Sequence, residues 1–284
     1  MSPAVQAVML ADRADGIRCF DPDHRSQSGD RRFDTCAWLD HAVRDLGVVD
    51  WMGPEACVGS AVDAALVEVI AGRSPDLPGL LDAAIGEMAD PKSSGVWDRT
   101  EMLTKTSRLV DLGVERVLPS YEAHGGVHAT QLELHVAIDD TLYHVHIDAV
   151  LGDGTIVDWK TSEKRLGDLA AHTSPQLTAY AYAIRAEYGQ LPPMVILDGL
   201  IYANPPADVR EADPAAVKPW WDRKRSTRTP EQIDAWLDDF RRREAARRWS
   251  RRTDIHPSQG RSAMEFVCGR CPAKPLCPSW DGTR

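Results

Sequence analysis

The fold of this chain is decided by residues 143–160, which read Tyr-His-Val-His-Ile-Asp-Ala-Val-Leu-Gly-Asp-Gly-Thr-Ile-Val-Asp-Trp-Lys. Apolar and polar residues alternate on both sides of a Gly-Asp-Gly at 152–154, which predicts two antiparallel strands joined by a tight turn. If the strands pair across this three-residue loop, Asp148 lies directly across from Asp158. Two carboxylates roughly 5 Å apart on a partly buried sheet face repel each other, so a cation is expected between them.

The second strand of this hairpin also offers an ammonium group to the same site. Lys160 points the same way as Asp158, and Trp159 points to the opposite face, because side chains alternate along a strand. Hard oxygen ligands hold Mg²⁺ or Mn²⁺. Such a metal acidifies a water and stabilises charge on a phosphate, and an adjacent ammonium orients that water. An exposed hairpin with acidic turn residues is the alternative interpretation.

The composition is that of an ordinary globular protein. The chain has 284 residues and a formal net charge of -10. No run of 18 apolar residues is present, and the N-terminus lacks the basic-then-apolar layout of a signal peptide. We therefore expect a cytoplasmic protein that has no membrane partner.

The order of elements predicts an α/β fold. A strand over 129–138 precedes the hairpin, a helix opens at Ser174-Pro175, and a buried strand covers 194–203. This order favours a central mixed sheet flanked by helices. We expect a single domain over 1–284 with five parts, which are a loosely ordered start (1–30), a helical part (31–128), a catalytic sheet core (129–204), a loop with a basic helix (205–260) and a cysteine-rich tail (261–284).

The helical part has three predicted segments. An amphipathic helix is expected over 30–46, with Cys36 on its apolar flank, where a lone cysteine is usually a small core residue. A second helix starts at Gly59, and Asp63 lies in its first turns, where a carboxylate suits the helix dipole. A third helical region covers 78–118, with a break near residues 90–92.

A basic region lies late in the chain. We expect a proline-rich excursion or loop over 204–230, followed by a helix that Thr229-Pro230 opens. Residues 218–252 contain 12 Lys and Arg against 6 Asp and Glu, a local net charge of +6. Basic residues beside tryptophans suit a phosphate backbone. A solvated helix carrying charges for solubility is the alternative.

Three cysteines stand close together in the tail. Cys268, Cys271 and Cys277 follow a Cys-x-x-Cys pattern with a third cysteine six residues later, in a segment rich in proline. So small a tail cannot fold on its own apolar content, which favours a bound metal or cluster. A Cys₄ site needs a fourth ligand.

Taken together, these motifs resemble the RecB-like branch of the PD-(D/E)XK nuclease superfamily, and within it the Cas4 and AddB-type nucleases that carry an iron–sulfur cluster. The resemblance extends over most of the chain and follows the family's order. It comprises Cys36, the helix from Gly59 to Asp63, Asp148, Asp158-Trp159-Lys160, Gln176-x-x-x-Tyr180, and the three cysteines of the tail.

The resemblance implies a metal-dependent DNA exonuclease that acts on single strands or exposed ends in recombination, repair or phage DNA processing. Asp63, Asp148 and Asp158 would hold Mg²⁺ or Mn²⁺, with the Trp159 carbonyl as a further ligand. Lys160 would position the water, and Gln176 and Tyr180 would orient its strand. A helicase or recombination partner is a further expectation.

The resemblance also implies a [4Fe–4S] cluster on Cys36, Cys268, Cys271 and Cys277, with zinc as the less favoured occupant. Cys57 and Cys19 are rivals for the fourth ligand. The family usually has a histidine where this chain has Asp63, so a catalytically weak DNA-binding or adaptor protein on the same fold is the alternative function.

Overall fold

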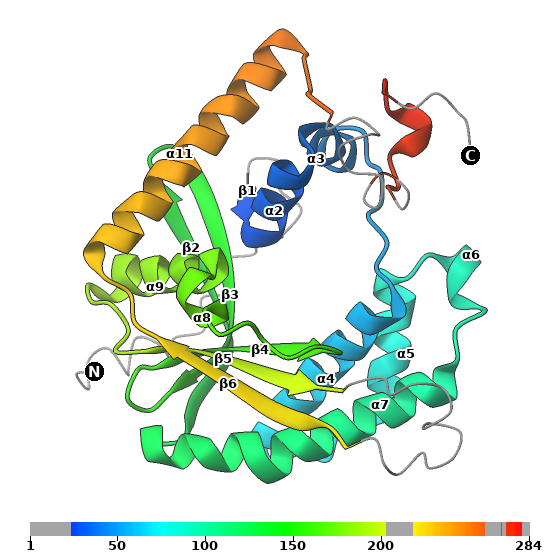
Figure 1. Cartoon of the computed structure of the whole chain (residues 1–284), viewed down its shortest axis with the longest axis vertical. Helices are drawn as coiled ribbons and strands as arrows, with labels where there is room; N and C mark the ends of the chain where they lie inside the picture. Colours follow the sequence, from blue (N-terminus) through cyan, green and yellow to red (C-terminus); the bar gives the residue numbers. More distant parts are fainter. Residues whose placement is uncertain (1–23, 203–217, 259–267, 269–270, 280–284) are drawn as a thin grey trace. The chain divides into compact units, whose positions relative to one another are not determined.

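The computed structural model describes residues 24–202, 218–258, 268 and 271–279. Figure 1 shows the whole chain coloured along its sequence. Our predictions for the loosely ordered start before residue 24, for Cys19, and for parts of the loop and tail lie outside these residues.

The chain divides into two compact units. The first contains Met52–Glu133 and His146–Arg228, and the second contains Leu134–Val145 with the described parts of Ala14–Trp51 and Thr229–Arg284. The single-domain organisation expected from the sequence stays a prediction.

Among the described residues, the sheet has six strands; five follow the order β1-β3-β4-β5-β6, and β2 pairs with β3. β1 runs parallel to β3 and β4 to β5, whereas β3–β4 and β5–β6 are antiparallel. The predicted α/β fold with a central mixed sheet is therefore confirmed. The strands are β1 (His24–Ser26), β2 (Val127–Ile138), β3 (Thr141–Leu151), β4 (Ile156–Ser162), β5 (Val195–Ile201) and β6 (Trp220–Ser226).

In the first unit, helices cover the strands. α4, α5 and α7 pack together, and α4 contacts β4, while α7 contacts β5. α9 also contacts β4, and α8 contacts β5 and β6. The apolar core includes Val157 and Trp159 of β4. The helices are α4 (Pro54–Ile70), α5 (Leu77–Met88), α6 (Pro91–Ser94), α7 (Arg99–Leu112), α8 (Ala170–Thr173) and α9 (Pro175–Tyr188), with a π-helical segment η1 (Gly113–Val117) and a 3₁₀ helix η2 (Leu118–His124).

Two helices begin where their sequences predict. The hydroxyl of Ser174 accepts a hydrogen bond from the backbone N–H of Leu177, and proline follows at the first position of α9. Thr229 and Gln232 form a reciprocal capping box at the start of α11 (Pro230–Thr253), which lies in the second unit. These local signals satisfy backbone N–H groups that have no partner inside the helix.

The helix predicted over 30–46 is in fact two helices of the second unit. α2 (Gln27–Thr35) and α3 (Ala37–Arg44) meet at Cys36, whose backbone is extended with φ -164°. The break lets Cys36 pack beside a small apolar cluster of Leu39, Ala42 and Ala273. The last element of this unit among the described residues is the turn η4 (Lys274–Leu276).

The prediction of a loop over 204–230 is wrong for Trp220–Ser226, which form strand β6 at the edge of the sheet. β6 pairs with β5 through the whole of Val195–Ile201. The charged residues of β6 fit a strand because their side chains are paired or buried: Arg223 pairs with Asp198, and Asp222 is itself buried.

Within the described residues, no helix has the length and apolar character needed to cross a membrane.

Candidate active site

The β3–β4 hairpin has the register that its sequence predicts. Ala149 pairs with Val157, and the N–H of Leu151 donates to the carbonyl of Thr155 at 2.8 Å. The same register places Asp148 across from Asp158. Beyond this point the N–H of Trp159 donates at 2.6 Å to the Asp148 carboxylate. The carboxylate of Asp148 therefore accepts a hydrogen bond that a backbone carbonyl group would accept if the β3–β4 ladder continued.

Asp158 and Lys160 form an ion pair at this point. The ammonium of Lys160 lies 2.9 Å from Oδ1 and 2.8 Å from Oδ2 of Asp158. The side chain of Asp158 is 1% exposed and that of Lys160 is 44% exposed. The lysine side chain thus stays partly accessible to solvent, while the carboxylate of Asp158 is anchored inside the protein.

Helix α9, which packs on β4, contributes two side chains next to the carboxylate of Asp158. The hydroxyl of Tyr180 lies 3.5 Å from Oδ1 of Asp158, and the amide of Gln176 donates to that hydroxyl at 2.6 Å. Residues four apart lie on one helix face, which explains why the two side chains meet. Gln176 and Tyr180 are thereby linked to the strand that they are predicted to orient.

Helix α4 brings Asp63 into the group because Gly59 permits a close approach. A Cβ atom at Gly59 would lie 2.8 Å from the hydroxyl oxygen of Thr161 in β4. One turn later, Oδ2 of Asp63 accepts a hydrogen bond of 3.0 Å from the amide of Gln131 in β2. The glycine of the motif therefore has a steric role, and the aspartate follows on the same face of the helix.

The three carboxylates share one electrostatic field. Burial raises the pKa of Asp63 to about 6, with Asp158 adding to the effect and Gln131 and Lys160 opposing it. Burial, and then the charges of Asp158 and Asp63, raise the pKa of Asp148 well above its usual value. Burial also raises the pKa of Asp158.

The pKa of Lys160 is also raised, by the carboxylates around it. Burial lowers the pKa of Lys160, but the charges of Asp158, Asp148 and Asp63 outweigh it, so that the pKa lies above its ordinary value. Concentrated negative charge of this kind favours a cation.

The donor chemistry of the site fits a hard divalent metal. Among the described residues, no three His, Cys, Asp or Glu side chains are grouped closely enough to form a ready metal site. Nevertheless, Oδ1 of Asp63 is buried and accepts no hydrogen bond from any described residue. A buried carboxylate oxygen without a partner is costly, and together with Asp148 and Asp158 it supplies the oxygen ligands that Mg²⁺ and Mn²⁺ prefer.

A buried network fixes the strand from its other face. The indole N–H of Trp159 donates to the hydroxyl of Tyr121 at 2.9 Å, and this hydroxyl donates to Asp198 at 2.6 Å. Asp198 is 0% exposed and also accepts two hydrogen bonds of 2.7 Å from Arg223. Sequence reasoning missed this network, although a lone aspartate inside the apolar strand β5 was a signal for it.

The cysteines predicted to bind a cluster belong to the second unit. Burial, and then the negative charges of Cys36 and Cys277, raise the pKa of Cys268. Burial and the charges of Cys36, Cys268 and Cys277 raise the pKa of Cys271. Within the part of the chain that the structure describes, however, these thiols are not grouped closely enough to form a ready metal site. The rival Cys57 is fully buried in the core of the first unit, and none of these five cysteines forms a disulfide.

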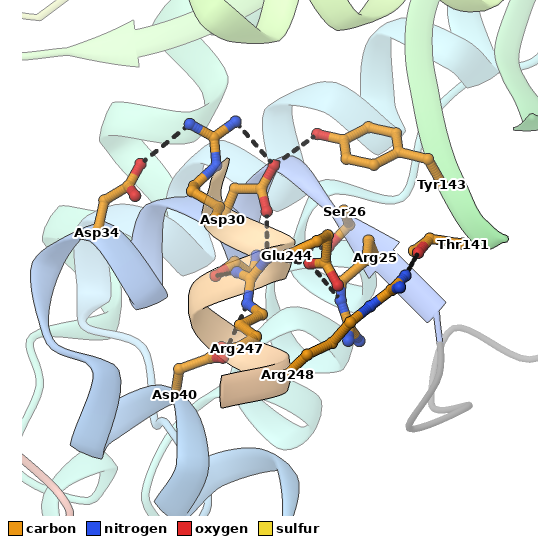
Figure 2. A network of polar contacts seen from close by, with 12 residues as sticks. Arg25, Ser26, Asp30, Asp34, Asp40, Thr141, Tyr143, Glu244, Arg247 and Arg248 are labelled. Carbon is orange, nitrogen blue, oxygen red and sulfur yellow. Dashed lines mark hydrogen bonds and ion pairs between the residues drawn. The ribbon is translucent and has the colours of Figure 1, made fainter. Parts of the chain in front are cut away.

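Several cations of the basic region over residues 218–252, which was expected to suit a phosphate backbone, form ion pairs within the protein. Figure 2 shows the clearest case, in which buried Arg247 of α11 lies 2.9 Å from Asp30 and 2.6 Å from Glu244. Arg25 completes the cluster at 2.7 Å from Glu244. Such arginines join α11 to the start of the chain, so they are unavailable for a phosphate backbone.

The site and fold define a class of protein in which paired acids and a lysine stand at the end of a hairpin in an α/β sheet. The model of the PD-(D/E)XK nuclease superfamily matches residues 24–278. The chain belongs to this superfamily. Membership supports a nuclease that hydrolyses phosphodiester bonds, with DNA as the implied substrate.

Solved structures add information about the fold alone. The crystal structure of a "Putative exonuclease" from Eubacterium rectale superposes with a TM-score of 0.54 at 11% identity, covering 84% of each chain. The structure of SSO0001 has a TM-score of 0.32 at 13% identity, covering 85% of this chain and 93% of the other. This similarity is too low to indicate a shared fold. No curated protein matches the chain.

Proposed function

We propose that this nuclease is a Mg²⁺- or Mn²⁺-dependent DNA exonuclease of the RecB and Cas4 type, acting on single strands or exposed duplex ends. The observation that carries the proposal is the end of the β3–β4 hairpin, where Asp148, Asp158 and Lys160 come together. Recombination, repair or phage DNA processing, with a helicase or recombination partner, would be the setting.

The residues of the site have separate tasks in this reaction. Asp63, Asp148 and Asp158 would hold the metal, and the Trp159 carbonyl is a further candidate ligand. When bound, the metal supplies an acidified water and neutralises charge on the scissile phosphate. The half-exposed ammonium of Lys160 orients the attacking water and assists its deprotonation. Gln176 and Tyr180 keep Asp158 in place through their hydrogen bonds.

Lys160→Ala tests this assignment. We expect the rate of digestion of end-labelled single-stranded DNA with Mn²⁺ to fall by about 10²–10³-fold, since the ammonium that orients the water and stabilises its developing negative charge is lost. Lys164→Ala is the matched control, because Lys164 is exposed just beyond β4 and is expected to leave the rate unchanged. Undiminished cleavage by Lys160→Ala would remove the mechanism.

The second candidate function is a DNA-binding or adaptor protein with weak catalysis. Asp63 in place of the family's histidine favours it. Purified protein that binds DNA ends but cleaves nothing with Mg²⁺ or Mn²⁺ would support this candidate, whereas digestion that stops on chelation would exclude it.

We also propose that Cys36, Cys268, Cys271 and Cys277 hold a [4Fe–4S] cluster. Cys36 and Cys277 both contribute to the raised pKa of Cys268 and of Cys271, which supports this ligand set over one that includes Cys57, a residue buried in the core of the first unit. Brown protein containing iron and sulfide is the expected result. Colourless protein containing zinc would overturn the cluster and leave a zinc-stapled nuclease.

A further inference from the structure

An unusual backbone conformation occurs next to the proposed metal ligands. Gln131 lies within β2 but has φ +53°, in the left-handed region. This conformation costs free energy for a residue with a Cβ atom, and inside a strand it redirects the side chain from its regular alternation. A strained residue of this kind persists only where its surroundings hold it.

The redirected side chain of Gln131 contacts Asp63. Its amide donates to Oδ2 at 3.0 Å, which leaves Oδ1 as the buried oxygen that receives no hydrogen bond from the described residues. An amide donor orients a carboxylate without neutralising it. A lysine or arginine in this position would compete with a divalent cation for the same charge.

We infer that Gln131 is a positioning residue, which holds the Asp63 carboxylate by one oxygen so that the other is presented to the metal. The inference rests on the proposed metal-dependent function. Hydrogen bonds to a metal-binding side chain commonly change metal affinity by about 10–100-fold. The backbone strain at Gln131 is, on this account, the consequence of directing the amide toward α4.

The test uses two variants of the full chain that lose the amide but differ in strain. Gln131→Met keeps the length of the side chain and the left-handed backbone. Gln131→Gly releases the strain, because glycine tolerates positive φ. Mn²⁺ affinity is measured from the EPR signal of free Mn²⁺, and thermal unfolding is followed without added metal. Asp63→Ala serves as the reference for a lost ligand.

Both variants are expected to bind Mn²⁺ about 10-fold more weakly than the wild type. Both variants leave Oδ2 of Asp63 without its donor and are expected to lower the Tm, but the Tm of Gln131→Gly should lie about 2–4 °C above that of Gln131→Met, because glycine relieves the positive φ. A lower Tm with the Mn²⁺ affinity of the wild type would show a merely structural role and would overturn the inference.

The other outcomes separate the inference from the proposed function. If Asp63→Ala weakens Mn²⁺ binding but both Gln131 variants bind like the wild type, Gln131 does not position the ligand and the metal site stands. If the wild type and Asp63→Ala bind Mn²⁺ equally, the proposed metal site fails and the inference fails with it.

Discussion

The carboxylate of Asp63 links pH to stability. Its pKa of about 6 lies above its ordinary value of 3.8, because burial disfavours the charged form. Between these two pH values the folded protein holds a proton that the unfolded chain has lost, so stability falls as pH rises. Below pH 3.8 the Asp63 carboxyl is protonated in both the folded and the unfolded protein, so its burial no longer makes stability depend on pH.

Asp63→Asn is expected to remove this dependence. In metal-free protein above pH 6, the variant should be more stable than the wild type by roughly 1–3 kcal/mol, and near pH 3 the two should be equal. Urea unfolding at a series of pH values measures the difference. A wild type that is the more stable of the two above pH 6 would show that burial does not raise this pKa.

Some residues of the candidate site follow from the sequence and others do not. The turn at 152–154 and strand alternation predict that Asp148, Asp158 and Lys160 share one face. Gln131 could not be found in this way, because a positive φ inside a strand leaves no mark in the pattern of polar and apolar residues. Asp198 does interrupt an apolar strand, but the sequence does not show its partners, because Tyr121 and Arg223 come from distant segments.

Contact between α4 and β4 depends on the absence of a side chain at Gly59. Gly59→Ala places a Cβ atom against the hydroxyl of Thr161, and overpacking of this kind costs about 1 kcal/mol or more. Thr161→Ala in the same chain removes the obstruction. We expect the double variant to recover at least about 0.5 kcal/mol relative to the sum of the single variants, as measured by urea unfolding. Strict additivity would contradict the close contact.

Elements with strong local signals were predictable, and those decided by tertiary contacts were not. α9 and α11 start at capping residues followed by proline, so their first turns could be read from the sequence. The break at Cys36 and the strand β6 carry no such signal. The break at Cys36 lets this residue pack beside Ala273. Strand β6 forms because it pairs with β5, although its charged residues do not favour a strand.

The second unit is held by ion pairs that connect distant parts of the sequence. Arg247, Asp30, Asp40 and Glu244 are all about 5% exposed or less, so removal of one charge leaves its partners buried and uncompensated. Figure 2 shows that these side chains come from α2, α3 and α11. The net charge of the chain therefore says little about which surfaces attract DNA.

Arg247→Met is expected to reduce the free energy of unfolding by about 3–5 kcal/mol, because three buried carboxylates lose their shared partner. Arg242→Met is the matched control, since Arg242 forms an exposed pair with Asp239 on the same helix and should cost less than about 1 kcal/mol. Guanidinium unfolding compares the two. Equal effects would mean that the buried network does not stabilise this unit.

We propose that the acids at the end of the β3–β4 hairpin are required for phosphodiester hydrolysis. The most direct measurement is the digestion of end-labelled single-stranded DNA with Mn²⁺ by the wild type and by Asp158→Asn, an isosteric change at the buried carboxylate. We predict digestion by the wild type and a loss on the order of 100-fold or more in the variant. Equal rates of digestion by the two folded proteins would contradict the claim.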